Sequence, residues 1–256
     1  MVLFTVVPLF IVVYYALTDS AGSFTLDNLV TVSGYGSVFA RSLLLALIST
    51  VVCLIIAFPV GYFLSRLRVN KQHIMLMLVM LPMWMNFLLR TYAWMGLLSV
   101  NGPVNAVLGV FGLGPYTMLN TSGAVVLGMV YNFLPFMVFP IYTLLSKMDY
   151  RLTEAAADLG CNNWQTLWKV TMPLSIPGIV SGITMVFMPS VTTFFIPRVL
   201  GGGNTMMFGD LIEAKFLTEG NWNVGSALSL IMMVLILISL SILRKADPNG
   251  EGGGIA

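Results

Sequence analysis

The stretch from Ser42 to Ser65 reads SLLLALISTVVCLIIAFPVGYFLS and contains no charged residue. A helix that crosses a bilayer needs about 20 mostly apolar residues, so this stretch is long enough to span one. The strands of a membrane barrel alternate apolar and polar residues over about ten positions, and this stretch does not alternate. It therefore predicts a membrane-spanning α-helix.

Composition extends that interpretation to the whole chain. Its 256 residues are 58% hydrophobic and 9% charged, whereas soluble domains carry about 25% charged residues. A net charge of +2 provides no basic surface for nucleic-acid phosphates. Two distant cysteines and one histidine offer neither a disulfide framework nor a set of metal ligands. We expect an integral membrane protein in contact with the lipid bilayer that binds no metal and no nucleic acid.

Five further apolar stretches predict five more spanning helices, so the expected fold is an all-α bundle of six. Prolines inside them are tolerated because neighbouring helices can satisfy the freed backbone groups. Gly178 and Gly182 form a G-x-x-x-G pair that favours close helix packing. The six predicted spans are residues 1–17, 42–65, 74–98, 122–146, 170–197 and 224–243.

The distribution of Lys and Arg predicts the orientation, because cytoplasmic loops carry an excess of these residues. With six spans and the N-terminus inside, eight basic residues fall on the cytoplasmic side and four on the other. We therefore expect a multi-pass protein with both termini in the cytoplasm. Residues 1–245 are expected to form one transmembrane domain, and the Gly-rich residues 246–256 a disordered cytoplasmic tail.

The cytoplasmic loop of residues 149–173 predicts a helix, a sharp turn and a second helix. Gly160 can end the first helix at a positive φ, and Asn162 with Gln165 resembles the capping box that starts a second one. These residues alone leave two interpretations open, a docking surface for another protein and a structural hairpin or lid. Four residues recur at helical spacing and share one face: Leu152, Ala155, Ala156 and Leu159.

The same loop resembles the Glu-Ala-Ala loop of the permease subunits of binding-protein-dependent ABC importers. Glu154-Ala155-Ala156 is followed after three residues by Gly160 and then by VTMP, where the family usually has Ile-x-Leu-Pro. The departures at Val170 and Met172 keep an apolar side chain. The resemblance implies a bundle of the type I importer permease kind, whose loop docks on an ATPase subunit. It assigns that coupling role to Arg151, Glu154, Ala155, Ala156, Asp158, Leu159, Gly160, Trp164 and Pro173.

Two other stretches resemble the spermidine/putrescine permeases, and most of all the first of the two paired permeases. Residues 81–94 read LPMWMNFLLRTYAW, similar to the third-span signature of that family, and residues 131–137 read YNFLPFM. The resemblance implies ATP-driven polyamine uptake by alternating access in the bacterial inner membrane. It also implies a heterodimer with a second homologous permease, two cytoplasmic ATPase subunits and an extracellular or periplasmic solute-binding protein.

No phosphate-binding loop of the form G-x-x-x-x-G-K-[ST] occurs in the chain, so we expect a transport subunit with no catalytic residue or cofactor of its own. ATP and Mg²⁺ would bind to the partner ATPases. Three alternatives remain open. The first is a permease of the same architecture for thiamine, ferric iron or phosphonate. The second is a secondary transporter, which would have coupling residues at mid-membrane. The third is a membrane-embedded enzyme, which would have a His, Asp or Glu cluster near a span.

An ionisable residue inside a span is a functional candidate, and Arg90 is the only one in the predicted spans. It is either extended toward lipid headgroups or makes a structural or gating contact facing the partner subunit. Aromatic faces attract ammonium groups, although Trp and Tyr also anchor helices at the membrane interface. The candidate substrate path comprises Asn86, Arg90, Tyr92, Trp94, Tyr131, Asn132, Thr192 and Phe195.

Three acids lie in the predicted outer loop before the last span: Asp210, Glu213 and Glu219. Because no Asp or Glu lies within a predicted span, a dication would meet only neutral ligands there. Clustered acids raise the local concentration of cations. We therefore expect these three carboxylates to form an outer mouth that attracts a cationic substrate.

Overall fold

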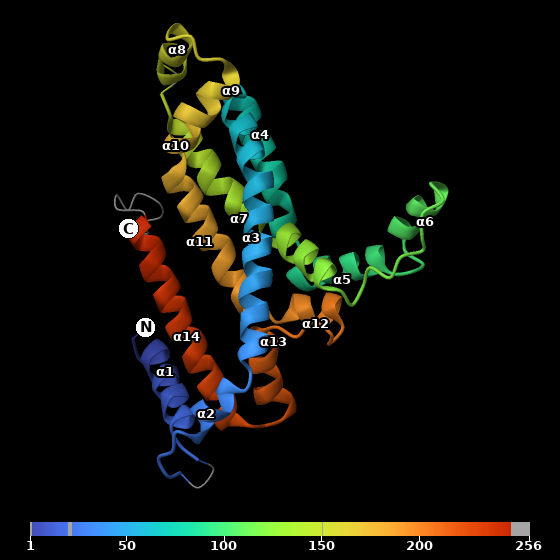
Figure 1. Ribbon diagram of the computed structural model, residues 1–256, viewed down its shortest axis with the longest axis vertical. Coiled ribbons are helices and arrows are strands. Elements are labelled where there is room, and N and C mark those ends of the chain that lie inside the picture. The colour runs from blue at the N-terminus through green and yellow to red at the C-terminus, as the bar shows by residue number, and fades with distance from the viewer. Residues whose placement is uncertain (1, 20–21, 150, 247–256) are drawn as a thin grey trace. The chain divides into compact units, whose positions relative to one another are not determined.

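The computed structural model describes residues 2–19, 22–149 and 151–246. Within these ranges the chain is helical and has no strand beyond an isolated bridge between Thr18 and Phe24. Figure 1 shows the helices in chain order. The chain divides into two compact units, which are described separately. The first unit comprises Met1–Ile48, Leu88–Met129 and Met188–Ser241, and the second comprises Ser49–Phe87, Val130–Phe187 and Ile242–Ala256.

Three predicted spans are confirmed as long apolar helices. They are α3 (Gly36–Ser65), α7 (Ser122–Lys147) and α14 (Trp222–Ala246). Prolines lie inside α3 and α7 without breaking either helix. One transmembrane domain over residues 1–245 stays a prediction. The predicted tail lies almost entirely outside the described residues.

The third predicted span is wrong as a single helix. The structure has α4 (Val69–Met80), a short 3-10 helix η1 (Leu81–Trp84) and α5 (Phe87–Leu98). Proline at position 82 cannot donate a backbone hydrogen bond and crowds the preceding turn, and Met85 has an extended backbone. The short helix α6 (Pro103–Val110) follows α5.

The fifth predicted span is bent. Its first part contains α9 (Asn163–Thr166), the π-helix η2 (Leu167–Thr171) and α10 (Met172–Leu174), and α11 (Ile176–Thr192) follows. The two parts meet at 65°. Among the described residues four helices are long and apolar enough to cross a membrane, or five if the bent pair counts as one span. One of the four runs from Phe87 to Val110. The expected six spans are therefore not confirmed, because α1 (Val2–Ala16) has only 15 residues.

Glycines bring the helices of the second unit close together. A Cβ at Gly178 would lie 3.0 Å from the carbonyl oxygen of Pro140, and one at Gly182 would lie 2.6 Å from the sulfur of Met137. Both contacts join α11 to α7. The G-x-x-x-G pair therefore packs as predicted, with the absence of side chains allowing two backbones to approach.

The first unit contains the shorter helices α2 (Asp27–Ser33), α12 (Phe195–Gly201), α13 (Phe208–Glu213) and the π-helix η3 (Ala214–Thr218). Hydrogen bonds join the start of α13 and the segment before it to α3. The amide of Phe208 donates to Oγ of Ser42 at 2.7 Å, and Arg41 donates to the carbonyl oxygen of Asn204 at 3.2 Å. Phe208 is only 1% exposed. These contacts hold the segment that carries the predicted outer acids.

Candidate functional site

The predicted hairpin between α7 and α11 is confirmed. The first helix, α8 (Arg151–Asp158), begins where the amide of Arg151 donates to Oδ1 of Asp149 at 2.9 Å. The turn that follows α8 contains Gly160, whose φ is +84°. The amide of Gly160 donates to the carbonyl of Ala157, and that of Cys161 to the carbonyl of Ala156. This pair of bonds is a Schellman motif, so a glycine fixes where the chain reverses.

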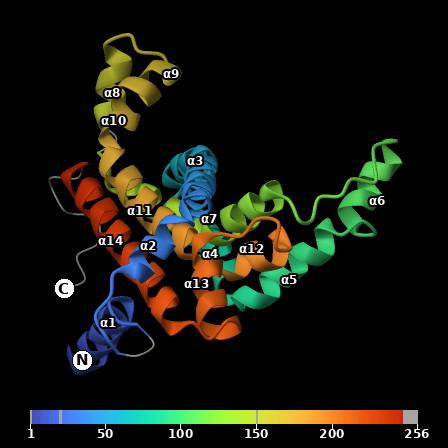
Figure 2. The ribbon, with the colours of Figure 1, turned by 60° about the horizontal axis from the view of Figure 1, so that its bottom comes forward.

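The second helix of the hairpin starts with the predicted capping box. The amide of Gln165 donates to Oδ1 of Asn162 at 2.8 Å, and the amide of Asn162 donates to Oε1 of Gln165 at 3.0 Å. Figure 2 shows α8 and α9 folded back at the end of α10. Both ends of the turn are therefore fixed by local hydrogen bonds, which gives the hairpin a defined shape before any partner binds.

The apolar face of this hairpin is open. Of the four residues predicted to share it, only Ala156 is buried, while Leu159 is 85% exposed. Trp164 and Trp168 are 66% and 49% exposed, and their rings pack edge to face with centroids 5.8 Å apart. The charged side chains of α8 and Pro173 are also exposed. Exposed apolar side chains gathered on one short hairpin are typical of a docking site.

The predicted path residues fall in both units. The first unit holds Arg90, Tyr92, Trp94, Thr192 and Phe195, and the second holds Asn86, Tyr131 and Asn132. Within the first unit the rings of Tyr92 and Phe195 meet edge to face at 5.6 Å. Arg90 is 7% exposed, which argues against a side chain extended toward lipid headgroups. Whether all eight residues line one route stays a prediction.

Two of the three predicted outer acids are paired with a base. Glu213 forms an ion pair with Arg198, and Glu219 with Lys215 at 2.6 Å. Asp210 is 6% exposed, and burial raises its pKa, with Arg198 opposing and Glu213 reinforcing the shift. The cluster is thus closer to neutral than its three acids alone indicate, which weakens the support for a cation-attracting mouth.

Residues 71–249 match the family described as the inner membrane component of binding-protein-dependent transport systems. This match covers more than half of the chain. The chain belongs to this permease family. Its relatives include the spermidine/putrescine transport system permease protein PotB of Haemophilus influenzae, which is 37% identical over 215 residues, 83% of this chain and 75% of the relative.

Solved structures show that the permease has the fold of ABC importer permeases. A bacterial ABC transporter involved in the import of the acidic polysaccharide alginate matches with a TM-score of 0.79 at 16% identity, over 95% of this permease and 91% of that chain. A structure of the alginate transporter in complex with its pentasaccharide-bound periplasmic protein matches with a TM-score of 0.68 at 15% identity, over 83% and 76%.

The raised pKa of Asp210 predicts a pH dependence. The folded permease keeps this proton at a pH where the unfolded chain has lost it, so stability falls as the pH rises through the window between the two pKa values. We expect Asp210→Asn to raise the Tm at pH 7 by a few degrees and to flatten this decline, measured by thermal unfolding between pH 4 and 8. The exposed Asp27→Asn is the control, and an unchanged pH profile for Asp210→Asn would contradict the assignment.

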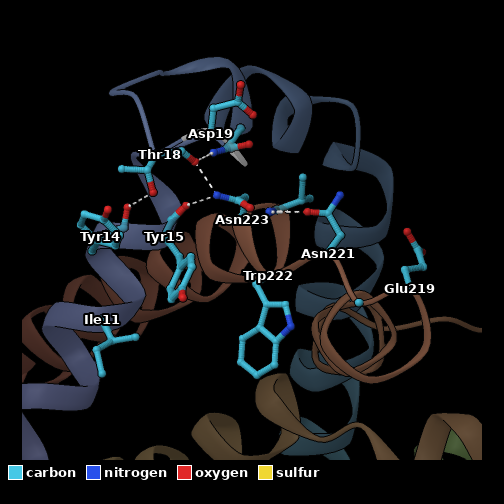
Figure 3. Close-up of a pocket in the computed structure, with 13 residues that line it drawn as sticks. Ile11, Tyr14, Tyr15, Thr18, Asp19, Glu219, Asn221, Trp222 and Asn223 are labelled. Atoms are coloured by element: carbon cyan, nitrogen blue, oxygen red, sulfur yellow. Dashed lines mark hydrogen bonds between the residues drawn. The ribbon is translucent and has the colours of Figure 1, made fainter.

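One feature of the permease was not predicted, an open cavity between the end of α1 and the start of α14 (Figure 3). Its walls include Tyr14, Tyr15, Asp19 and Trp222. Adjacent tyrosines at the end of the first span and a tryptophan at the start of the last were visible in the sequence. Because aromatic residues at span ends commonly anchor helices at the membrane interface, they did not indicate a cavity.

Proposed function

We propose that this chain is the permease subunit of an ATP-driven importer for polyamines such as spermidine and putrescine. The observation that carries this proposal is its 37% identity to the PotB permease over most of both chains. The chain would lie in the bacterial inner membrane with both termini in the cytoplasm, as its Lys and Arg distribution favours. It would pair with a second homologous permease and receive substrate from an external binding protein.

The hairpin supports the assignment of a cytoplasmic partner. We assign ATPase docking to the exposed side chains of α8 and to Trp164 and Trp168, because burying apolar surface contributes about 25 cal/mol per Å². Glu154, Asp158 and Arg151 lie exposed on the same short helix and are available to charges at the rim of an ATPase groove. ATP and Mg²⁺ would bind to the two ATPase subunits and not to this chain.

The transport step follows from this docking. Closure of an ATPase pair would displace the hairpin and favour one of two packings of the permease, which is a shift of population between existing states. Aromatic residues and amide oxygens along the eight-residue candidate path suit an ammonium substrate. The outer acids would add a modest attraction for cations, since two of them are already paired.

Uptake measurements test the proposal. Cells that carry this permease with its neighbouring transport genes, and no other polyamine importer, should accumulate radiolabelled spermidine or putrescine. Unlabelled polyamine should compete, whereas thiamine, ferric iron and phosphonates should not. Competition by one of those solutes instead would assign the permease to that substrate. Uptake that persists when the ATPase is inactivated would favour a secondary transporter.

A further inference from the structure

Four basic residues lie at the ends of three helices in the second unit, and they are called the basic cluster below. Arg66 and Arg68 follow the last residue of α3, Lys71 lies in the first turn of α4, and Lys147 ends α7. No Asp or Glu occurs from residue 28 to residue 148, so every charge on α3, α4 and α7 is positive. An excess of bases indicates the cytoplasmic side, but it does not by itself bring the bases together in space.

Contacts between α3 and α7 place the ends of these two helices at the same level. Sγ of Cys53 donates to the carbonyl oxygen of Val130 at 3.8 Å, and a Cβ at Gly61 would lie 3.0 Å from Cγ2 of Ile141. Both helices advance in the same direction between these two contacts, so they run parallel. Beyond the second contact α3 continues for four residues and α7 for six, which is about 6 and 9 Å at 1.5 Å per residue.

The turn from α3 into α4 is fixed by the side-chain amide of Gln72. Its Nε2 donates to the carbonyl oxygens of Ser65 at 3.1 Å and Leu67 at 2.7 Å. Its Oε1 accepts from the hydroxyl of Tyr142 at 3.1 Å, and Tyr142 lies on α7. One amide therefore joins all three helix ends, so the backbone that carries the basic cluster has a defined path before any ligand binds.

The basic cluster keeps its positive charge. Both ion pairs among the described residues lie in the first unit, so neither neutralises it. The acid nearest to it in sequence, Asp149, accepts the amide of Arg151 at 2.9 Å and caps α8. Arg66 is half-buried, and its guanidinium lies 5.2 Å from the ring centroid of Tyr62. The other three members are exposed: Arg68, Lys71 and Lys147.

Exposed apolar side chains border the basic cluster. Phe63 in the last turn of α3 is 63% exposed, and Val69 at the start of α4 is 65% exposed. Farther along, α4 has no buried residue, and Ile74 and Met77 are exposed. An acidic protein surface would complement the charges but would leave this apolar surface uncovered. An anionic phospholipid carries a phosphate and acyl chains in one molecule, and bases beside a spanning helix attract such headgroups.

We propose that the basic cluster binds the phosphate of an anionic phospholipid in the inner leaflet, whose acyl chains lie against α4. The guanidinium of Arg68 can hold two phosphate oxygens at once, and the two lysines add charge around them. Only the side of the membrane rests on the proposed function, because the cluster lies at the end of α7 that leads into the hairpin. The headgroup chemistry does not depend on the transported solute.

Lipid binding to the purified importer tests the site. The permease with its partner subunits is delipidated in dodecyl maltoside and titrated with dioleoylphosphatidylglycerol or with dioleoylphosphatidylcholine, which has no net charge. Native mass spectrometry counts the bound lipids. We expect the wild type to prefer the anionic lipid at least tenfold. Arg68→Gln should weaken its binding about fivefold, and the triple variant Arg68→Gln, Lys71→Gln, Lys147→Gln should bind both lipids alike, since each base near an anionic surface is worth about fivefold in affinity.

Matched variants separate the site from general damage. Arg68→Lys keeps the charge and should lose no more than about twofold. Arg41→Gln removes an exposed base from the opposite end of α3 and should keep the wild-type preference. Gel filtration shows whether each complex is intact. If the triple variant does not assemble, the comparison of Arg68→Gln with Arg41→Gln still decides.

Two results would overturn the inference. One is equal binding of the two lipids by the wild type, and the other is a triple variant that keeps the preference for phosphatidylglycerol. If that variant keeps the preference and loses its ATPase subunits, the basic cluster is a protein contact instead. Detergent micelles have no sides and the titration contains no substrate, so a reversed orientation or the uptake of another solute would refute the proposed function and leave this binding result intact.

Discussion

Replacing Gly160 by valine is expected to reduce the recovery of ATPase subunits with the permease about tenfold or more, while the chain still inserts into the membrane. The φ of Gly160 is +84°, a region that a β-branched residue enters only at a cost of about 1–3 kcal/mol. Because this residue fixes the reversal between α8 and α9, relief of the strain would turn α8 away from its docking position. Affinity purification of the tagged permease followed by quantification of the ATPase measures the effect.

Two variants make this prediction specific. Gly112 also has a positive φ, +72°, with no atom within 4 Å of a built Cβ, but it lies in the first unit after α6. Gly112→Val should therefore carry similar backbone strain and leave ATPase recovery unchanged. Gly160→Asn should be milder than valine, since asparagine enters the left-handed region more readily. Full ATPase recovery with Gly160→Val would remove the docking role of the hairpin.

Gly209→Ala is expected to lower the stability of the first unit by about 1–3 kcal/mol, the usual cost of overpacking. A Cβ at this position would clash with the carbonyl oxygens of Thr192 and Thr193, the latter at 2.8 Å. These are backbone atoms at the end of α11, so no side-chain rotation relieves the contact. For a chain of this size each kcal/mol corresponds to roughly 2–4 °C in Tm, which thermal unfolding in detergent resolves.

The control for Gly209 is another glycine of the same unit. Gly109 lies in α6 with no atom within 4 Å of a built Cβ, and alanine there improves helix propensity by up to about 1 kcal/mol. Gly109→Ala should therefore leave the Tm unchanged or raise it slightly. Equal Tm values for Gly209→Ala and the wild type would show that α13 moves away from α11 at no cost.

The long helices were predictable and their breaks were not. Charge-free runs are sufficient to predict α3, α7 and α14, because apolar length is a property of the sequence. The prolines inside α7 do not interrupt that helix, whereas α4 stops beside Pro82. The most apolar window of α7 is 61% buried, whereas α4 has no buried residue. The tolerance of a proline depends on neighbours that can satisfy the freed backbone groups, and a sequence does not show them.

The functional-site features were likewise predictable only where they depend on residues close together in the sequence. Gly160 and the capping box of Asn162 with Gln165 depend on residues a few positions apart, and the structure confirms both. The pairing of Glu219 with Lys215 at i,i+4 spacing was readable from the sequence, but that of Glu213 with Arg198 joins two different helices. The cavity beside Trp222 brings together residues about 200 positions apart, and no local pattern indicates such a contact.

The 65° bend between α10 and α11 has a mechanical consequence. If the junction at Ser175 is stiff, a push directed along α10 displaces α11 more sideways than lengthwise, because the two axes lie closer to perpendicular than to parallel. With a stiff junction, α11 would then move mainly sideways in the membrane and less along its own axis. At 65° the sideways displacement is about twice the lengthwise one, so the same push would separate α11 from a neighbour more than it would change the depth of the helix in the bilayer.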